Sequence, residues 1–327
     1  MNKGYLLITF DPKGDDRKII SREISELANV VYLHDIPKEK IKSYLESVDV
    51  ILTGSGLDLG REILALTKNL KMIQTLSAGA DYIPFDSIPE HVIICTNSGA
   101  NAPAVAEHVF GLILLATKKI LYHHENMRKG VWKRREYGDM LRGKILGIIG
   151  FGSIGREVAR IAKCLGMIVY GINRSGKTDV PVDFIGTPED MDFVLKNSDI
   201  ILISVPLNKY TANLIGSYEL SLMKSDAILV NVSRGKVIDQ KALYEHLKRN
   251  EQFIACLDVW WKYPKKGGEI CFQDYPFHKL HNVIMTPHIA GFAKNIRNTV
   301  IIKALENIKR FLLGEKPMNI VRREDYI

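Results

Sequence analysis

The chain has 327 residues, 46% of them hydrophobic and 25% charged, which is typical of a globular protein with two domains. Its apolar runs are much shorter than the roughly 20 residues of a membrane span, and its N-terminus lacks a signal-peptide pattern, so we expect a cytoplasmic protein without a membrane segment. The net charge of +8 comes from scattered basic residues without a nucleic-acid-binding motif, which favours small anionic ligands over nucleic acid. The four cysteines are too dispersed to predict a disulfide framework or a zinc site.

Short apolar runs alternate with amphipathic segments over the first part of the chain. This alternation is typical of parallel strands joined by crossover helices, so we predict a small α/β domain. The strands are expected at residues 5–10, 30–33, 48–53, 71–76 and 92–96, and the helices at residues 17–27, 37–46 and 58–67.

A segment rich in turn-forming residues, 96–103, leads into a long apolar helix predicted over 104–121. Asn101 is suited to cap the helix, and Pro103 falls in its first turn. The helix is apolar on most faces, so it should be buried between layers. A linker followed by a buried helix indicates a crossing between two domains.

A second α/β series begins at Lys144 and predicts another parallel sheet. Its strands are expected at residues 145–149, 167–172, 200–205, 227–232, 254–257 and 283–285. Its helices are expected at residues 153–165, 187–197, 218–222 and 240–250, and a last helix follows at 294–313.

A G-x-G-x-x-G loop joins the first strand of this second series to its first helix. Gly150 permits a tight turn, Gly152 lets the backbone approach a pyrophosphate, and Gly155 lets the helix pack closely on the strand. The free N–H groups of the helix N-terminus then favour the phosphates. The residues of this loop that we expect to bind a dinucleotide are Gly150, Phe151, Gly152, Ser153, Ile154 and Gly155.

The end of the next strand indicates which dinucleotide binds. An acid at this place binds the ribose 2′-hydroxyl of NAD, but this chain has Asn173 there, followed by Arg174 and Ser175. Without a carboxylate to repel it, a 2′-phosphate can be held by Arg174, Ser175 and Lys177 through charge-assisted hydrogen bonds. The sequence therefore favours NADP(H), with NAD(H) as the alternative.

Two later motifs fit a hydride-transfer site for a 2-keto acid. Arg234 follows one predicted strand and His288 follows another, so both lie where open α/β sheets bind ligands. Arg234 offers a permanent cation for a carboxylate, and His288 can exchange a proton near neutral pH.

The order of these motifs resembles the D-isomer-specific 2-hydroxyacid dehydrogenase family over nearly the whole chain. The motifs that carry the resemblance are the glycine loop, Asn231-Val232-Ser233-Arg234-Gly235, Ala255-Cys256-Leu257-Asp258-Val259, Thr286-Pro287-His288-Ile289-Ala290-Gly291 and Leu76-Ser77-Ala78-Gly79-Ala80-Asp81-Tyr82-Ile83. The resemblance implies an α/β fold of two Rossmann-like or flavodoxin-like domains and a homodimer. The cofactor domain, 99–288, would be a doubly wound parallel sheet inserted into a substrate domain formed by 1–98 and 289–327.

The resemblance also implies roles for individual residues. Arg234 would bind the substrate and His288 would be the acid/base. The backbone of Ser77, Ala78, Gly79 and Ala80 would bind the substrate carboxylate. The cofactor contacts beyond the two loops above would be Val205, Pro206, Ser233, Arg234, Asp258 at the nicotinamide carboxamide, His288, Ala290 and Gly291.

One position departs from the family pattern. In most members a glutamate five residues after the conserved aspartate bonds to the catalytic histidine, whereas Tyr263 stands five residues after Asp258 here. A carboxylate favours imidazolium, so without it ketoacid reduction should weaken sooner as the pH rises. Glu269, further along the same loop, is a candidate to replace the missing acid.

Two alternatives to a D-2-hydroxyacid dehydrogenase remain. Asp258-Val259-Trp260 is also similar to formate dehydrogenases, which have glutamine in place of the glutamate, but these usually use NAD. Some other relatives are corepressors that use the fold as a dinucleotide-sensing binding module. The substrate expected from the resemblance is a small 2-keto or 2-hydroxy acid.

Overall fold

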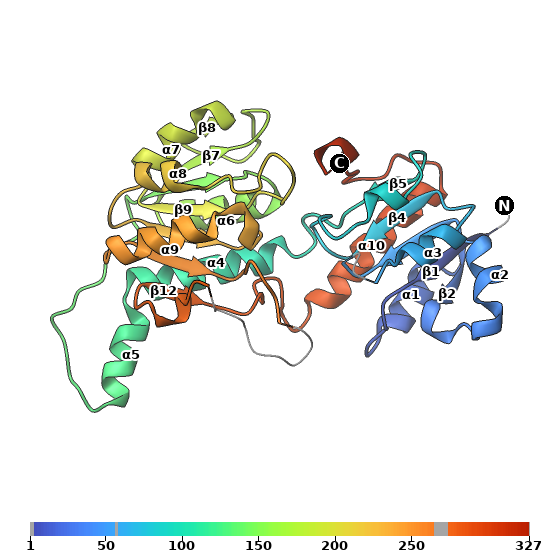
Figure 1. Ribbon diagram of the computed structural model, residues 1–327, viewed down its shortest axis with the longest axis horizontal. Coiled ribbons are helices and arrows are strands. Elements are labelled where there is room, and N and C mark those ends of the chain that lie inside the picture. Colours follow the sequence, from blue (N-terminus) through green and yellow to red (C-terminus); the bar gives the residue numbers. More distant parts are fainter. Residues whose placement is uncertain (1–2, 56–57, 265–273, 327) are drawn as a thin grey trace. The chain divides into compact units, whose positions relative to one another are not determined.

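The computed structural model describes residues 3–55, 58–264 and 274–326. The chain forms two compact units, the first comprising Met1–Asn101 and Ala293–Ile327 and the second comprising Ala102–Phe292. Figure 1 shows both units, with most of their helices and strands labelled. We predict that the first unit binds the substrate and that the second unit binds the cofactor.

The first unit contains a five-stranded parallel sheet with strand order β2-β1-β3-β4-β5. Helices α1 and α10 cover one face, where Ile20 and Ile308 are buried, and α2 and α3 cover the other, where Leu45 and Leu64 are buried. The strands are β1 (Gly4–Ile8), β2 (Ala28–Tyr32), β3 (Val50–Thr53), β4 (Met72–Thr75) and β5 (Ile93–Cys95). The helices are α1 (Asp16–Ile24), α2 (Ile41–Glu46), α3 (Arg61–Leu66) and α10 (Ile296–Leu312).

The second unit contains a seven-stranded parallel sheet with strand order β12-β11-β10-β9-β6-β7-β8. The chain order reverses between β6 and β9, so the sheet is doubly wound. The strands are β6 (Ile145–Ile149), β7 (Ile168–Ile172), β8 (Phe184–Gly186), β9 (Ile200–Ile203), β10 (Ile228–Asn231), β11 (Ile254–Leu257) and β12 (Val283–Met285). The predicted α/β class with parallel sheets is confirmed; the three-residue edge strand β8 was not predicted.

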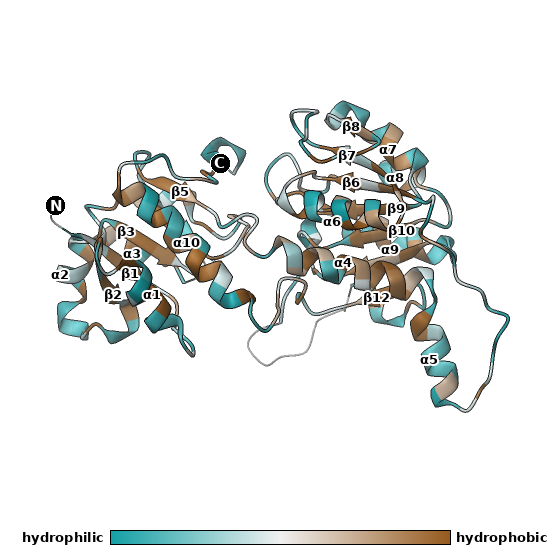
Figure 2. Ribbon diagram, turned by 180° about the vertical axis from the view of Figure 1, so that it is seen from behind, coloured by the Kyte–Doolittle hydropathy of each residue, from teal (hydrophilic) through white to brown (hydrophobic). Residues whose placement is uncertain are grey.

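Helices cover both faces of this sheet. One buried cluster joins α4 and α6 to the sheet, and another joins α7, α8 and α9 to its opposite face. The helices are α4 (Ala102–Thr117), α5 (Ile120–Arg128), α6 (Ser153–Cys164), α7 (Met191–Asn197), α8 (Ser217–Leu222) and α9 (Gln240–Arg249). The strands carry mostly hydrophobic residues while α6 mixes hydrophilic and hydrophobic ones (Figure 2), as expected for a sheet buried under amphipathic helices.

The single helix predicted over 104–121 is wrong in one respect, because the structure has two helices there. Lys119 adopts a left-handed conformation with φ of 52°, which ends the helical path of α4, and α5 then begins at Ile120. Figure 1 shows α5 and the segment after it extending away from the sheet of their unit. None of the helices in the described part of the chain is long and apolar enough to cross a membrane.

Candidate active site

The predicted site residues of the second unit gather at the carboxyl edge of its sheet. Gly150 follows β6, Val205 follows β9, Ser233 follows β10, Asp258 follows β11 and His288 follows β12. Because all these strands are parallel, their carboxyl ends lie at one edge. Open α/β sheets bind their ligands at this edge, next to the point where the strand order reverses.

The glycine loop is packed so tightly that two of its glycines admit no side chain. Gly150 has φ of 101°, and a Cβ there would lie 2.7 Å from the backbone N of Val205. A Cβ on Gly155 would lie 2.9 Å from the carbonyl oxygen of Gly150. The loop is also tied to β9, because the Ser204 hydroxyl donates a hydrogen bond to that carbonyl over 2.9 Å.

Gly152 differs from these two glycines, because a Cβ there would meet no atom within 4 Å. It caps the N-terminus of α6, whose first N–H groups have no partners within the helix. The loop therefore presents open backbone and a positive helix end together, which fits the pyrophosphate of a dinucleotide. Phe151 is buried with its ring beside Gly171, so it can contact such a ligand only through its backbone.

The loop after β7 is organised by the side chain of Asn173. Its Oδ1 accepts hydrogen bonds from the N–H of Ser175 at 3.0 Å and from its hydroxyl at 3.1 Å, and its Nδ2 donates to the Lys177 carbonyl at 2.8 Å. Arg174, Ser175 and Lys177 are exposed. The loop thus offers two cations and a hydroxyl at the end of the second strand, where dinucleotide-binding α/β folds contact the ribose.

The turn that carries Arg234 is held by Asn231 at the end of β10. Asn231 Oδ1 accepts from the Ser233 N–H at 3.0 Å and hydroxyl at 2.9 Å, and its Nδ2 donates to the Arg234 carbonyl at 3.0 Å. The next residue must be glycine, because a Cβ on Gly235 would lie 2.3 Å from the carbonyl carbon of Trp260. The backbone of this turn is therefore fixed against the β11 loop.

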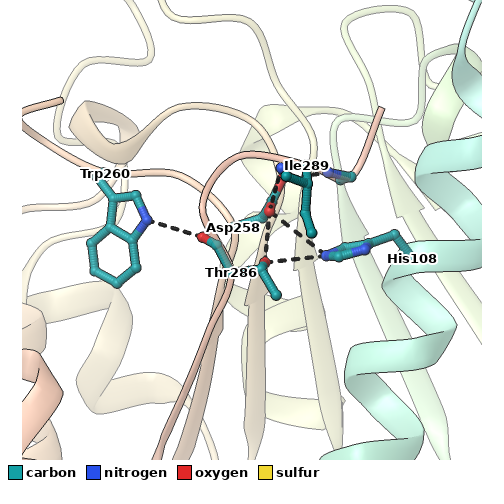
Figure 3. Close-up of polar contacts among 6 residues, drawn as sticks. His108, Asp258, Trp260, Thr286 and Ile289 are labelled. Carbon is teal, nitrogen blue, oxygen red and sulfur yellow. Dashed lines mark hydrogen bonds and ion pairs between the residues drawn. The ribbon is translucent and has the colours of Figure 1, made fainter. Parts of the chain in front are cut away.

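The carboxylate of Asp258 holds the loop that carries His288 (Figure 3). Oδ1 accepts hydrogen bonds from Thr286 Oγ1 at 2.6 Å and from the Ile289 N–H at 2.9 Å, while Oδ2 accepts from the Ala290 N–H at 2.9 Å. His288 has φ of 58°, a left-handed conformation that is uncommon outside glycine. Asp258 is fully buried, and its charge-assisted bonds hold the side chain of Thr286 before His288 and the backbone of Ile289 and Ala290 after it.

Tyr263 packs against His288, with ring centroids 5.5 Å apart and planes tilted by 37°. Its hydroxyl accepts a long hydrogen bond of 3.4 Å from the Trp260 N–H. The Trp260 indole in turn donates to the Thr286 carbonyl over 3.1 Å. The structure therefore brings Tyr263 to the predicted acid/base, whereas Glu269 lies outside the described residues.

The remaining predicted cofactor residues also lie near this edge. Val205 and Pro206 follow β9 after Ser204. Ala290 is buried and lies two residues after His288 in the same loop, with Gly291 next in sequence. The Pro206 carbonyl accepts a hydrogen bond of 2.5 Å from Thr211.

The predicted substrate loop, Ser77–Ala80, follows β4 in the first unit. The Ser77 N–H donates to the Gly54 carbonyl at 3.1 Å, and the Ser77 carbonyl accepts from the Asn97 N–H at 2.8 Å. The Ser77 hydroxyl donates to the Gly79 carbonyl at 2.8 Å. These bonds fix the turn through its own backbone.

A partly buried carboxylate supports the neighbouring loop of the first unit. Asp58 accepts from the hydroxyls of Thr9 at 2.6 Å and Thr53 at 2.8 Å and from the Gly54 N–H at 3.3 Å. Burial alone would raise the pKa of Asp58, but these hydrogen bonds outweigh burial and hold the pKa below its ordinary value of 3.8. Asp58 thereby orders Gly54, which in turn bonds to the Ser77 loop.

Three residues of the site were missed by sequence reasoning: His108, Asn231 and Thr286. Asn231 and Thr286 lie inside the motifs quoted above, but the motifs do not reveal the roles of their side chains. Asn231 bonds to Ser233 and to the Arg234 backbone, and Thr286 bonds to Asp258. His108 lies on α4, far from Thr286 in sequence, where it stands among the apolar residues of a helix. A polar residue on a buried helical face is a signal that could have found it.

The doubly wound sheet and its glycine loop define the second unit as a dinucleotide-binding domain of the Rossmann type. A family model described as "D-isomer specific 2-hydroxyacid dehydrogenase, NAD binding domain" matches residues 110–290. The chain therefore belongs to the D-isomer specific 2-hydroxyacid dehydrogenase family.

Three similar proteins illustrate this membership. The chain is 34% identical to a D-3-phosphoglycerate dehydrogenase of Methanocaldococcus jannaschii over 97% of its own length, but spans only 59% of that relative. It is 32% identical to a glyoxylate reductase of Pyrococcus furiosus, covering 89% of this chain and 87% of the relative. An acyclic imino acid reductase in complex with NADPH and D-arginine superposes with a TM-score of 0.78 at 31% identity, covering 97% of this chain and 100% of that one.

Proposed function

We propose that this protein interconverts a small 2-keto acid and the corresponding D-2-hydroxy acid with a nicotinamide dinucleotide. The observation that carries the proposal is the single sheet edge on which Gly150–Gly155, Arg234 and His288 stand, each on a backbone fixed by hydrogen bonds or close packing. The similarity to a glyoxylate reductase supports a substrate of this class.

Each side chain then has a defined task in the reaction. A bound nicotinamide supplies or accepts a hydride at the substrate C2. Arg234 pairs its planar guanidinium with the substrate carboxylate and carbonyl, and charge-assisted hydrogen bonds orient them. His288 gives a proton to the carbonyl oxygen as negative charge develops there, and takes it back in the oxidation. The family also assigns backbone contacts with the carboxylate to residues 77–80.

NADP(H) is the proposed cofactor, with NAD(H) as the alternative. The Gly152 backbone and the α6 N-terminus would hold the pyrophosphate, and Arg174, Ser175 and Lys177 would hold a 2′-phosphate. Asp258 is assigned to the nicotinamide carboxamide by family resemblance.

The direct test measures oxidation of NADPH and of NADH with glyoxylate, hydroxypyruvate, pyruvate and phenylpyruvate. Turnover that prefers NADPH and is lost in Arg234→Ala and His288→Asn supports the proposal. Dinucleotide binding without turnover on any of these acids would contradict it and favour a sensing module. Oxidation of formate alone would favour the formate-dehydrogenase alternative.

A second candidate is reduction of a 2-imino acid to a D-amino acid, and the observation that favours it is Tyr263 against His288. A protonated imine already carries its proton on nitrogen, so hydride addition needs no acid at the reacting atom, and a neutral partner for His288 suffices. The similarity to an imino acid reductase supports the idea. Mass spectrometry of products formed from the same keto acids with ammonium or methylamine distinguishes amino from hydroxy acids.

We further propose a homodimer, because apolar side chains are exposed on α5 and the segment after it. Trp132 is 72% exposed and Tyr137 is 77% exposed. A cavity of about 620 Å³, lined in part by Tyr137, lies at the amino ends of β6 and β9 to β12, away from the candidate active site. The other exposed apolar residues of this segment are Ile120, Leu121, Tyr122, Met127, Val131 and Met140.

A patch of this kind on a water-exposed surface is typical of a protein interface. Sedimentation equilibrium should therefore give a dimer for the parent and a weaker one for Trp132→Ser/Tyr137→Ser. Tyr210→Ser, an exposed aromatic elsewhere in the unit, should leave the dimer unchanged. A monomeric parent would contradict the proposal.

A further inference from the structure

A histidine on helix α4 reaches the loop that carries His288 (Figure 3). His108 Nε2 lies 3.2 Å from Thr286 Oγ1 and 3.7 Å from Asp258 Oδ1. The Asp258 side chain is fully buried and that of His108 is only 20% exposed, so water competes little with these contacts. The α4 helix thus contributes a side chain to the hydrogen bonds around the loop.

The short contact between Thr286 and Asp258 fixes the direction of these bonds. A threonine hydroxyl has one proton, and the ionised carboxylate can only accept. The 2.6 Å separation of Thr286 Oγ1 and Asp258 Oδ1 therefore requires that proton to lie between them. Thr286 Oγ1 is then an acceptor toward His108, whose Nε2 must carry a proton and donate it.

The chain of donors ends on the carboxylate that positions the loop. His108 orients the Thr286 hydroxyl, and Asp258 accepts from Thr286 and from the N–H groups of Ile289 and Ala290. The residue between these anchors, His288, has a left-handed backbone that the surroundings must maintain.

We propose that His108 is a positioning residue for His288, acting through Thr286 and Asp258 with its Nε2 protonated. The inference rests on the proposed acid/base role of His288. His108 itself does not touch the reacting atoms. Its loss should therefore lower kcat with little change in the KM for the keto acid, which Arg234 determines.

The kinetic test exploits which ring nitrogen makes the contact. Gln places its amide NH₂ near the position of a histidine Nε2, whereas Asn places it near Nδ1. His108→Gln should keep most of the parent kcat, while His108→Asn and His108→Ala should lower it by about tenfold or more, the effect expected when a hydrogen bond to a buried group is lost. Glu107→Gln, on the exposed side of the same helix, is the control.

Thr286 offers an independent check. Thr286→Ser keeps the hydroxyl and should behave like the parent, whereas Thr286→Val should lower kcat as His108→Ala does. Because both act through one chain of bonds, the double variant His108→Ala/Thr286→Val should be little worse than the poorer single variant. Equal kcat in His108→Gln, His108→Asn and His108→Ala, or losses that multiply in the double variant, would overturn the proposal.

A spectroscopic measurement separates this inference from the proposed function. Long-range ¹H–¹⁵N NMR correlations of the histidine-labelled full chain should show the Nε2–H form for the signal that disappears in His108→Gln. This measurement requires no turnover. An inactive protein that shows the Nε2–H signal would therefore contradict the proposed function but support the hydrogen bonds from His108 through Thr286 to Asp258. A deprotonated Nε2 would overturn the network even in an active enzyme. Circular dichroism and NADPH binding confirm that each variant is folded.

Discussion

The phenol ring of Tyr263 lies against the imidazole of His288, with centroids 5.5 Å apart and planes tilted by 37°. An aromatic face can orient an imidazole by contact, but it does not bring the full negative charge that a glutamate brings at this place in most of the family. The contact therefore orients the proposed acid/base without placing a carboxylate charge beside it.

Replacing Tyr263 by Glu should extend ketoacid reduction to higher pH. A carboxylate beside an imidazole favours its protonated form, and protonated His288 is the proposed proton donor in reduction. The alkaline limb of kcat/KM should therefore move up by about one pH unit or more. Tyr263→Phe keeps the ring and removes the hydroxyl that accepts from the Trp260 backbone N–H at 3.4 Å, without adding a charge, so its pH profile should follow that of the parent. Superimposable profiles for Tyr263→Glu and the parent would show that residue 263 does not govern the protonation of His288.

Asn173 should decide between the two dinucleotides. Asn173→Asp introduces a charge that repels a 2′-phosphate and accepts from a ribose 2′-hydroxyl, while keeping an oxygen for the Ser175 donors. The ratio of kcat/KM for NADPH to that for NADH should fall by about tenfold or more. Asn173→Ser removes the amide without adding charge, so a comparable fall there would assign the effect to loop disorder instead.

Gly152 should be required for nucleotide binding and not for folding. A Cβ added at Gly152 would have no protein atom within 4 Å, so Gly152→Ala should leave the melting temperature unchanged. The added methyl group would occupy the open side of the loop, where the pyrophosphate is expected, and should weaken NADPH binding about tenfold or more in calorimetry. Gly111→Ala on α4 is also unobstructed and should leave binding unchanged. Gly150→Ala, with a clash at 2.7 Å and a positive φ, should instead lose stability.

Features that depend on residues close together in the sequence could be predicted, whereas features that depend on contacts between distant residues could not. Alternating apolar runs predicted both parallel sheets, because strand and helix periodicity is local, and the glycine loop was predicted because three spaced glycines and the flanking elements lie within one stretch of chain. The break between α4 and α5 depends on one backbone angle at Lys119, for which the sequence has no Gly or Pro signal. The contact of His108 with Thr286 joins residues 178 positions apart, so only the packing of α4 on the sheet could reveal it.

Asp58 should make the first unit more stable at neutral pH than in acid. Hydrogen bonds from Thr9, Thr53 and Gly54 hold its pKa below 3.8 despite burial. A carboxyl whose pKa is lower in the folded state stabilises that state above the unfolded pKa, and the stabilisation is lost as the pH falls through the folded pKa.

Asp58→Asn should therefore lower the free energy of unfolding at pH 7 by about 1–3 kcal/mol, because an amide nitrogen cannot accept from a hydroxyl. The difference in unfolding free energy between Asp58→Asn and the parent should shrink as the pH falls below about 4, because the Asp58 carboxyl of the parent then becomes protonated and loses its charge. Asp86→Asn, which breaks an exposed pair with Arg61, is the matched control and should have little effect at any pH. A difference for Asp58→Asn that stays constant from pH 7 to pH 3 would show that the side chain acts through its shape and not through its charge.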